Sequence, residues 1–476
     1  MSGTSRAIGA GARCGRGGIA SAALLAVAAG AFLAGSAGVA TAESLRQALE
    51  STYVTNQELE AQRASTRATD ENVPQALSTG RPRLSGSGDV GYQRQETILN
   101  PPLVGSAGRV SPYGFSITAT QPVFRGFRTL NSVKQADSIV RAAREALLNT
   151  EQNVLFSAAE TYVNVVRDGS IVSLRANNVN VLTEQLRATR DRFTVGEVTR
   201  TDVAQAEARL SLAISTLNLA RANLNSSRAV YDQVIGHPAN GPVQPPSIEL
   251  KLPRSLDEAL LSADSEHPAI RTAIYSAEAA DFGVDVTTGE LLPTVSLDAS
   301  FTKRWDPTVA TKRTETAAIT GRVTVPFYQG GEVSSRVRQA KEVRAQRRLE
   351  LELVRRQVRA AVISAWGQLD ATKAQIRSGQ AQVRASEVAL AGVREEAKVG
   401  QRTTLDVLDA EQELLDARVS LVSTRRDYVV ASYALLSAVG RLSASKLGLN
   451  VAIYDPMVNY NKVRNKWFGL GPSDQN

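Results

Sequence analysis

The sequence repeats itself, and this duplication limits what the chain can fold into. TVGEVTRTDV begins at Thr194 and KVGQRTTLDV begins at Lys398. The two stretches are 204 positions apart, and other positions match at the same spacing: Pro122 with Pro326, Gly126 with Gly330, Gly196 with Gly400, and Gly236 with Gly440. A period of this length is far longer than one solenoid repeat. The chain therefore contains a duplicated unit of domain size.

Near the start of each unit the spacing is 211 positions instead. Ser44-Leu45 then matches Ser255-Leu256, and Pro82 matches Pro293. The change of spacing falls between Pro82 and Pro122, so we interpret it as a loop that differs in length between the two units.

The first 42 residues have the pattern of a secretory signal peptide. The pattern consists of a basic start, an uncharged apolar run and a small-residue cleavage site, found at Arg6, Arg13 and Arg16, at Ile19–Ala34, and at Ala40-Thr41-Ala42. Such a segment is removed on secretion. We expect the mature chain to begin near Glu43 and to lack Cys14. No other stretch reaches the ~18 apolar residues that a membrane-spanning helix needs.

The composition excludes several kinds of functional site. One cysteine and two histidines in 476 residues cannot supply a disulfide framework or a Cys/His zinc site. There is no Ser-His-Asp set, metal-ligand spacing or phosphate loop, so we expect neither an enzyme nor a cofactor. Charges of both signs interleave without a basic aromatic patch, which argues against a nucleic-acid partner. His237 and His267 both precede proline, and we interpret them as turn or helix-start residues.

Each unit is expected to contain a helical stretch, two strands and a very long helical hairpin, in that order. The first unit spans residues 43–236, a proline-rich linker spans 237–254, the second unit spans 255–440, and a tail spans 441–476. The expected elements are initial helical stretches at 43–77 and 255–290, strands at 83–95, 112–123, 294–302 and 318–327, and surface loops at 97–111 and 302–317. The fold class is therefore mainly α with a small β part.

The four expected strands alternate between apolar and polar residues. In the third strand, apolar residues at 295, 297, 299 and 301 oppose polar residues at 296, 298 and 302. This alternation suits either two hairpins on a soluble core or part of a transmembrane barrel. Four strands cannot close a barrel, and open edges are not tolerated in lipid. The barrel interpretation therefore requires several chains to pool their strands.

The long stretches lack proline from Val123 to His237 and from Phe327 to Asp455. Apolar residues recur seven positions apart in them, which suits coiled-coil packing. Glycine is a common helix terminator, and Gly196 and Gly400 each stand shortly before a Thr-x-x-Asp capping pattern. The repeated motifs therefore predict the tips of two helical hairpins, near residues 194–202 and 398–406.

With these features, the chain resembles the TolC family of outer-membrane efflux and type I secretion channels. The resemblance rests on the V-G-x-x-[TR]-x-x-D-V tips, on Pro122-Val-Phe-Arg-Gly126 and Pro326-Phe-Tyr-Gln-Gly330, and on the tail from Tyr454 to Gly469. It implies a homotrimer with a 12-strand β-barrel in the outer membrane, continued by a 12-helix α-barrel in the periplasm. It also implies export of small toxic compounds or proteins, together with a periplasmic adaptor and an inner-membrane RND or ABC transporter.

The resemblance further implies an iris-like gate at the periplasmic end. Asp406 and Asp409 match the family's paired aspartates, which ring the narrowest point and attract cations. Arg402 and Asp202 match a link between hairpins that holds the closed state. The family also has a tyrosine in this link, and here its position is Ala397.

Simpler roles remain open for some of these residues. Asp202 and Asp406 recur in both units at a cap position, so helix capping alone would explain them. Asp409 and Arg402 correspond to Gln205 and Val198 in the first unit. Capping therefore does not explain Asp409 and Arg402. At the tips, Val195, Gly196, Val399 and Gly400 are candidate adaptor contacts, although the turn itself requires the glycines.

The alternative to a channel is a periplasmic adaptor or another coiled-coil scaffold. An adaptor would show one hairpin, compact β domains and an inner-membrane anchor. This sequence predicts two hairpins and no anchor, so the channel is preferred.

Overall fold

The computed structural model describes residues 43–98, 100, 105–239 and 252–471. The expected signal peptide, residues 1–42, and residues 240–251 of the expected linker lie outside the described residues. None of the described helices is long and apolar enough to cross a membrane.

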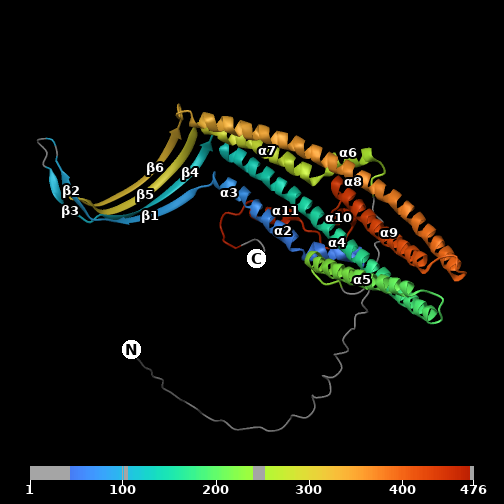
Figure 1. The fold of residues 1–476 in the computed structure, drawn as a ribbon. Coiled ribbons are helices and arrows are strands. Elements are labelled where there is room, and N and C mark those ends of the chain that lie inside the picture. Colours follow the sequence, from blue (N-terminus) through green and yellow to red (C-terminus); the bar gives the residue numbers. More distant parts are fainter. Residues whose placement is uncertain (1–42, 99, 101–104, 240–251, 472–476) are drawn as a thin grey trace, which may run out of the picture. The chain divides into compact units, whose positions relative to one another are not determined.

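Helices make up most of the described chain (Figure 1). They are α1 (Leu45–Thr55), α2 (Gln57–Asp70), α3 (Asn72–Ser78), α4 (Arg128–Thr194), α5 (Arg200–Ile235), α6 (Leu256–Glu266), α7 (Pro268–Thr288), α8 (Glu332–Lys398), α9 (Thr404–Val439), α10 (Ala444–Leu447) and α11 (Pro456–Val463), with a short 3-10 helix η1 (Gly289–Leu291). The strands are β1 (Arg83–Val90), β2 (Gln93–Thr97), β3 (Ser106–Val110), β4 (Tyr113–Arg125), β5 (Thr294–Thr308) and β6 (Thr311–Thr324). The expectation of a mainly α chain with a small β part is confirmed.

The duplication holds for the long helices residue by residue. Helices α4 and α8 each have 67 residues, and α5 and α9 each have 36. At 1.5 Å per residue, a 67-residue helix is about 100 Å long. Helix α5 folds back along α4, and α9 folds back along α8, so the chain contains two long hairpins (Figure 1).

The initial helical stretch of each unit is divided rather than continuous. In the first unit, Asn56 separates α1 from α2, and its side chain accepts hydrogen bonds from the backbone N–H groups of Glu58 and Leu59. In the second unit, His267 caps α7 and Nδ1 accepts a hydrogen bond from the N–H of Ala269, with Pro268 at the first helical position. The interpretation of His267 as a helix-start residue is confirmed. Asn56 and His267 occupy matching positions of the duplicated unit.

The two units share one antiparallel sheet of strand order β1-β4-β5-β6. The register places the apolar residues of all four strands on one face: Tyr113 lies opposite Trp305 and Val90, and Ile117 lies opposite Phe301. The other face is polar and hydrogen-bonded, since Thr120 donates to Asp298 at 2.9 Å and the hydroxyls of Ser87 and Ser116 are 2.9 Å apart. β4 lies beside β5, so the sheet joins the units, while β1 and β6 form its two edges.

Three of the sequence predictions for this region are wrong in extent. The first expected strand, 83–95, is divided into β1 and β2, and the expected loop 97–111 contains β3, which pairs with β2. The expected loop 302–317 is instead the end of a long hairpin, in which Thr308 pairs with Thr311. Beyond Phe301 most side chains on both faces of these strands are charged or carry hydroxyls, and Trp305 alone of residues 302–306 is a large apolar side chain. The apolar alternation that marks a half-buried strand therefore weakens, although the pairing continues.

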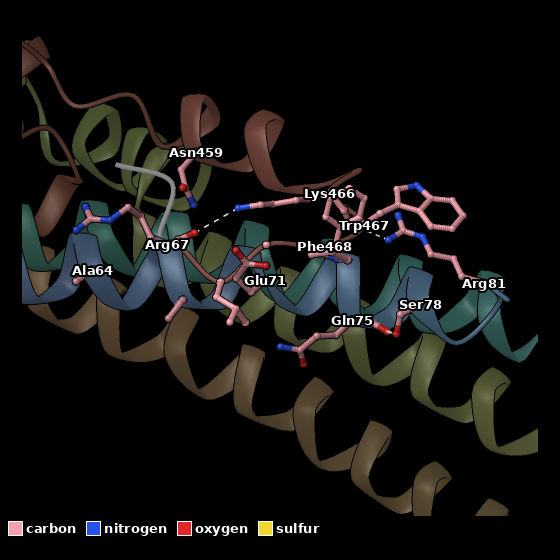
Figure 2. A pocket seen from close by; sticks show the side chains of 15 residues that line it. Ala64, Arg67, Glu71, Gln75, Ser78, Arg81, Asn459, Lys466, Trp467 and Phe468 are labelled. Carbon is pink, nitrogen blue, oxygen red and sulfur yellow. Dashed lines mark hydrogen bonds between the residues drawn. The ribbon is translucent and has the colours of Figure 1, made fainter. Parts of the chain in front are cut away.

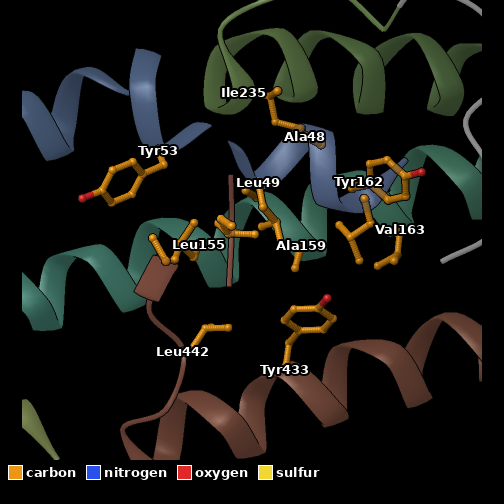
Figure 3. Packing of buried hydrophobic residues seen from close by; sticks show 14 of the residues in the cluster. Ala48, Leu49, Tyr53, Leu155, Ala159, Tyr162, Val163, Ile235, Tyr433 and Leu442 are labelled. Carbon is orange, nitrogen blue, oxygen red and sulfur yellow. The ribbon is translucent and has the colours of Figure 1, made fainter. Parts of the chain in front are cut away.

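The largest apolar cluster lies where helices from both units and the tail meet (Figure 3). Leu155 and Tyr162 of α4 are fully buried there, together with Tyr231 of α5 and Leu442 after α9. The Tyr162 hydroxyl donates to the backbone oxygen of Glu43 at 2.8 Å. This cluster holds α1, α4, α5 and α9 together and fixes the start of the C-terminal tail.

Candidate functional site at the hairpin tips

Each hairpin turns through the same glycine-dependent motif. Gly196 and Gly400 have φ of 82° and 80°, a left-handed conformation that favours glycine. The N–H of Glu197 donates to the oxygen of Arg192 at 3.0 Å, and the N–H of Gln401 donates to the oxygen of Glu396 at 2.9 Å. These bonds, with those of the glycines themselves, define a Schellman motif at each tip.

Both tips present the same apolar side chain to solvent. Val195 and Val399 precede the turn glycines and are each 71% exposed. No described atom lies within 4 Å of a Cβ built on Gly196 or Gly400, so the turns have open space around them.

The helices that follow the turns begin with matching capping boxes. The N–H of Thr199 donates to Asp202 Oδ2 at 2.8 Å, and the N–H of Thr403 donates to Asp406 Oδ2 at 2.9 Å. These hydrogen bonds hold the pKa of both carboxyls below the ordinary value; for Asp202 the Thr199 hydroxyl contributes most, and for Asp406 the backbone N–H of Thr403. The capping role of Asp202 and Asp406 is therefore confirmed.

Asp409 lies one helical turn further along α9 and joins the two hairpins. Its Oδ1 accepts a hydrogen bond from Arg209 Nη2 of α5 at 2.5 Å, so the contact is an ion pair. Beside it, Leu408 of α9 is buried against Leu182 of α4 and Ala213 of α5. A charged contact and an apolar contact thus hold the hairpins together near their tips.

Arg209 is not among the residues predicted from the sequence, although the duplication contains a signal for it. The position that matches Arg209 in the second unit is Glu413, so the charge there is reversed between the units. The position that matches Asp409 in the first unit is the neutral Gln205. At Arg209 and Asp409, the charge difference between the copies therefore coincides with the contact between the hairpins.

Arg402 and Asp202 are not brought together within the chain. Arg402 Nε instead lies 2.8 Å from Glu396 Oε2 of α8, and this hydrogen bond raises the pKa of Arg402. Arg402 therefore ties the end of α8 to its own turn. Ala397, which stands where the family has a tyrosine, is the helix residue next to Glu396.

Further ion pairs brace each hairpin internally at matching positions. Arg190 of α4 pairs with Glu207 of α5 at 2.6 Å, and Arg394 of α8 pairs with Glu411 of α9 at 2.8 Å. Among the described residues, no group of three or more His, Cys, Asp or Glu side chains is placed to hold a metal ion.

Comparison with known proteins agrees with this geometry. The model of the family described as "Outer membrane efflux protein" matches residues 46–237 and 259–441. The outer membrane efflux protein BepC of Brucella suis is 42% identical over 447 residues, covering 94% of this chain and 95% of BepC. The outer membrane protein TolC of Escherichia coli K12 is 26% identical, covering 91% and 90% of the two chains.

Solved structures show the same fold. The CmeC outer membrane channel of Campylobacter jejuni superimposes with a TM-score of 0.75 at 18% identity, covering 89% of each chain. The relatives named here are efflux and channel proteins of the outer membrane, so the predicted resemblance is confirmed and the periplasmic scaffold is set aside. The duplicated hairpins and their shared sheet are those of an outer-membrane exit duct, and the chain belongs to the outer membrane efflux protein family.

Proposed function

We propose that three copies of this chain form one exit duct whose periplasmic mouth is gated at the hairpin tips. The duct receives small toxic compounds or proteins from a periplasmic adaptor and an inner-membrane RND or ABC transporter. The observation that carries the gate is the Arg209–Asp409 contact, because it joins the two hairpins of one chain at the end where they must separate.

The sheet supports assembly from several copies. β1 and β6 are its edges, and in each the backbone groups that face away from the sheet have no strand partner among the described residues. In lipid every backbone polar group must be satisfied, so β1 of one copy would pair with β6 of the next. Three copies then supply twelve strands, with the apolar face toward lipid and the face carrying Asp298 and Thr120 toward the lumen.

The gate follows from the charges at the tips. In the conformation described, Arg209 partly neutralises Asp409, and three copies would place three such pairs around the mouth. An exposed ion pair contributes about 0–1 kcal/mol, so three pairs could shift an open–closed equilibrium by roughly a hundredfold at most. When the hairpins separate, Arg209 leaves and the aspartates attract cations.

The tips suit a partner protein. Val195 and Val399 are exposed apolar side chains on two equivalent turns, and the space around Gly196 and Gly400 allows a partner to approach closely. We propose that these four residues contact the adaptor. The Arg402–Asp202 link between hairpins, which would hold the closed state, stays a prediction.

Conductance of the mature protein in a planar bilayer tests the gate. We expect wild type to show a small, cation-preferring conductance that a trivalent cation blocks from the tip side, and Asp409→Asn to resist this block. Arg209→Glu places like charges together and should raise the open fraction several-fold. The swap Arg209→Asp with Asp409→Arg should restore the closed state, since the pair is then re-formed.

Arg190→Glu is the matched control. It breaks the ion pair with Glu207, which has the same chemistry but lies within one hairpin. We expect no change in open fraction. An equal effect of Arg190→Glu and Arg209→Glu would contradict the gate, and the absence of any channel from a folded trimer would contradict the duct.

A further inference from the structure

The C-terminal tail has no part in the gate, yet it is firmly held. Leu442 and Ala444 are buried in the main apolar cluster, and Tyr460 of α11 packs against Val73 and Val140. Asn459 Nδ2 donates to Asp70 Oδ2 of α2 at 2.7 Å. The chain is thus guided along α2 and α3 toward the sheet.

The described tail ends in a small loop, Lys466–Gly471, which we call the terminal loop. Lys466 Nζ donates to the oxygen of Gly471 at 3.3 Å and closes the loop, and Gly469 has a φ of 119° that other residues rarely adopt. Trp467, Phe468 and Leu470 are 65%, 90% and 105% exposed. Three large apolar side chains on one short loop form an exposed patch of the kind that marks an interaction site.

One arginine holds this loop at the junction between helices and sheet (Figure 2). Arg81 Nη1 donates to the oxygen of Lys466 at 2.7 Å, and its guanidinium lies 4.6 Å from the centre of the Trp467 ring. Arg81 stands between the end of α3 at Ser78 and the start of β1 at Arg83. Trp467 therefore lies level with the beginning of the sheet.

A groove of about 670 Å³ separates the terminal loop from α2 and α3. Its helix side carries Arg67, Glu71, Gln75 and Ser78, as Figure 2 shows. The helix side of the groove also carries Ala64, Ala68 and Pro74, and across the groove Trp467, Phe468 and Leu470 stay largely exposed.

Other exposed aromatic residues lie at the same junction. Phe127 follows β4, which ends at Arg125, and Phe327 and Tyr328 follow β6, which ends at Thr324. Aromatic side chains with nearby Lys and Arg are typical of the boundary between lipid and water, where the rings lie at headgroup level and the cations reach phosphate. The terminal loop adds both kinds of residue to this boundary.

We propose that the terminal loop is a membrane-contact site, in which Trp467 and Phe468 enter the periplasmic headgroup region of the outer membrane. Arg81, Arg464 and Lys466 then face the anionic phosphates of the lipid. The inference rests on the proposed function, in which the sheet crosses the membrane. It assigns the loop a lipid surface as its partner, because Arg81 ties the exposed apolar side chains of the loop beside the start of the sheet and adds positive charge there.

The three tryptophans of the chain provide the test. Each is kept alone by replacing the other two with phenylalanine, and the assembled protein is placed in vesicles with or without lipids brominated near the headgroup. The Trp467-only protein should lose about half of its emission to the bromines, as expected for an interfacial ring. The Trp366-only protein should lose almost none, since Trp366 packs against the helical cluster of Val358 and Val362.

The Trp305-only protein separates failure of this inference from failure of the proposed function. Trp305 stacks on Tyr113 in the apolar face of the sheet, with ring centres 5.2 Å apart. If Trp305 is quenched and Trp467 is not, the sheet is in lipid and the loop is covered by something else, such as a second copy, which overturns the inference. If Trp305 is not quenched either, the sheet is not in the membrane and both proposals fall.

Discussion

Helices α4 and α8 have the same length and the same place in the duplicated unit, yet they are buried very differently. α4 buries residues along most of its length, from Ala136 to Thr189, because α5, α7, α9 and α2 surround it. α8 buries far fewer residues over a similar length: Val333, Val358, Val362, Leu369, Thr372, Ser386 and Leu390. The fully buried Leu155 of α4 corresponds to the exposed Arg359 of α8.

Helix α4 therefore completes its packing within one chain, whereas α8 leaves one side open. The open side of α8 carries exposed Leu349 and Leu353, which line a shallow groove. In the proposed trimer, we expect this open side of α8 to face the next copy.

The largest effect on the free energy of unfolding should come from truncating the buried Leu155 side chain. Leu155→Ala should lower the free energy of unfolding by about 2–5 kcal/mol, because it leaves a cavity in the main apolar cluster. Arg359→Ala, at the matching position of α8, should change it by less than about 0.5 kcal/mol. Denaturant titration of the two variants measures the contrast, and equal losses would contradict the packing difference.

A charge on the open side of α8 should act on assembly instead. If copies meet at this side of α8, as we expect, Leu349→Glu buries an unpaired carboxylate in their contact and should prevent a stable trimer. The single chain should keep its helical content, since Leu349 is exposed within it. Size-exclusion chromatography with light scattering measures the loss of trimer. Leu349→Met is the matched control, and a trimer of normal stability from Leu349→Glu would place the contact elsewhere.

The smallest effect concerns the matching caps Asn56 and His267. Burial lowers the pKa of His267 from 6.5 to about 4. Its neutral ring therefore contributes stability that is complete above pH ~6.5 and is lost as the pH falls toward 4, with a slope of at most about 1.4 kcal/mol per pH unit. Asn56 does not titrate, so the first unit lacks this dependence.

His267→Asn should flatten the pH dependence of the melting temperature between pH 6.5 and 4, and Asn56→His should steepen it. The neighbouring Glu266 contributes to the pH dependence only below about pH 4.5, because hydrogen bonds from Arg441 and Lys446 lower its pKa to about 2. Its contribution is complete above about pH 4.5 and is lost only toward pH 2. An unchanged pH profile in His267→Asn would show that the ring does not report on folding.

The sequence predicted half of the candidate site. Turn glycines and capping aspartates were predictable because each acts on backbone groups within five residues of itself. The partner of Asp409 was not, since Arg209 lies 200 positions away. The charge difference between Arg209 and Glu413 singles out position 209, but it does not identify Asp409 as the residue that Arg209 contacts. The resemblance implied a link between hairpins from Arg402 to Asp202, which stays a prediction, and within the chain Arg402 pairs with Glu396.

By itself, the sequence determined the duplication, the two hairpins with their tips, and the alternating strands. These follow from periodicity and from contacts between near neighbours, which are the same wherever the segment lies. Only the tertiary structure decided that α4 is enclosed and α8 open, that Arg209 meets Asp409, and that Arg81 holds Trp467 beside the sheet. Such contacts join residues far apart in the chain, and their pairing depends on how whole helices pack rather than on any local pattern.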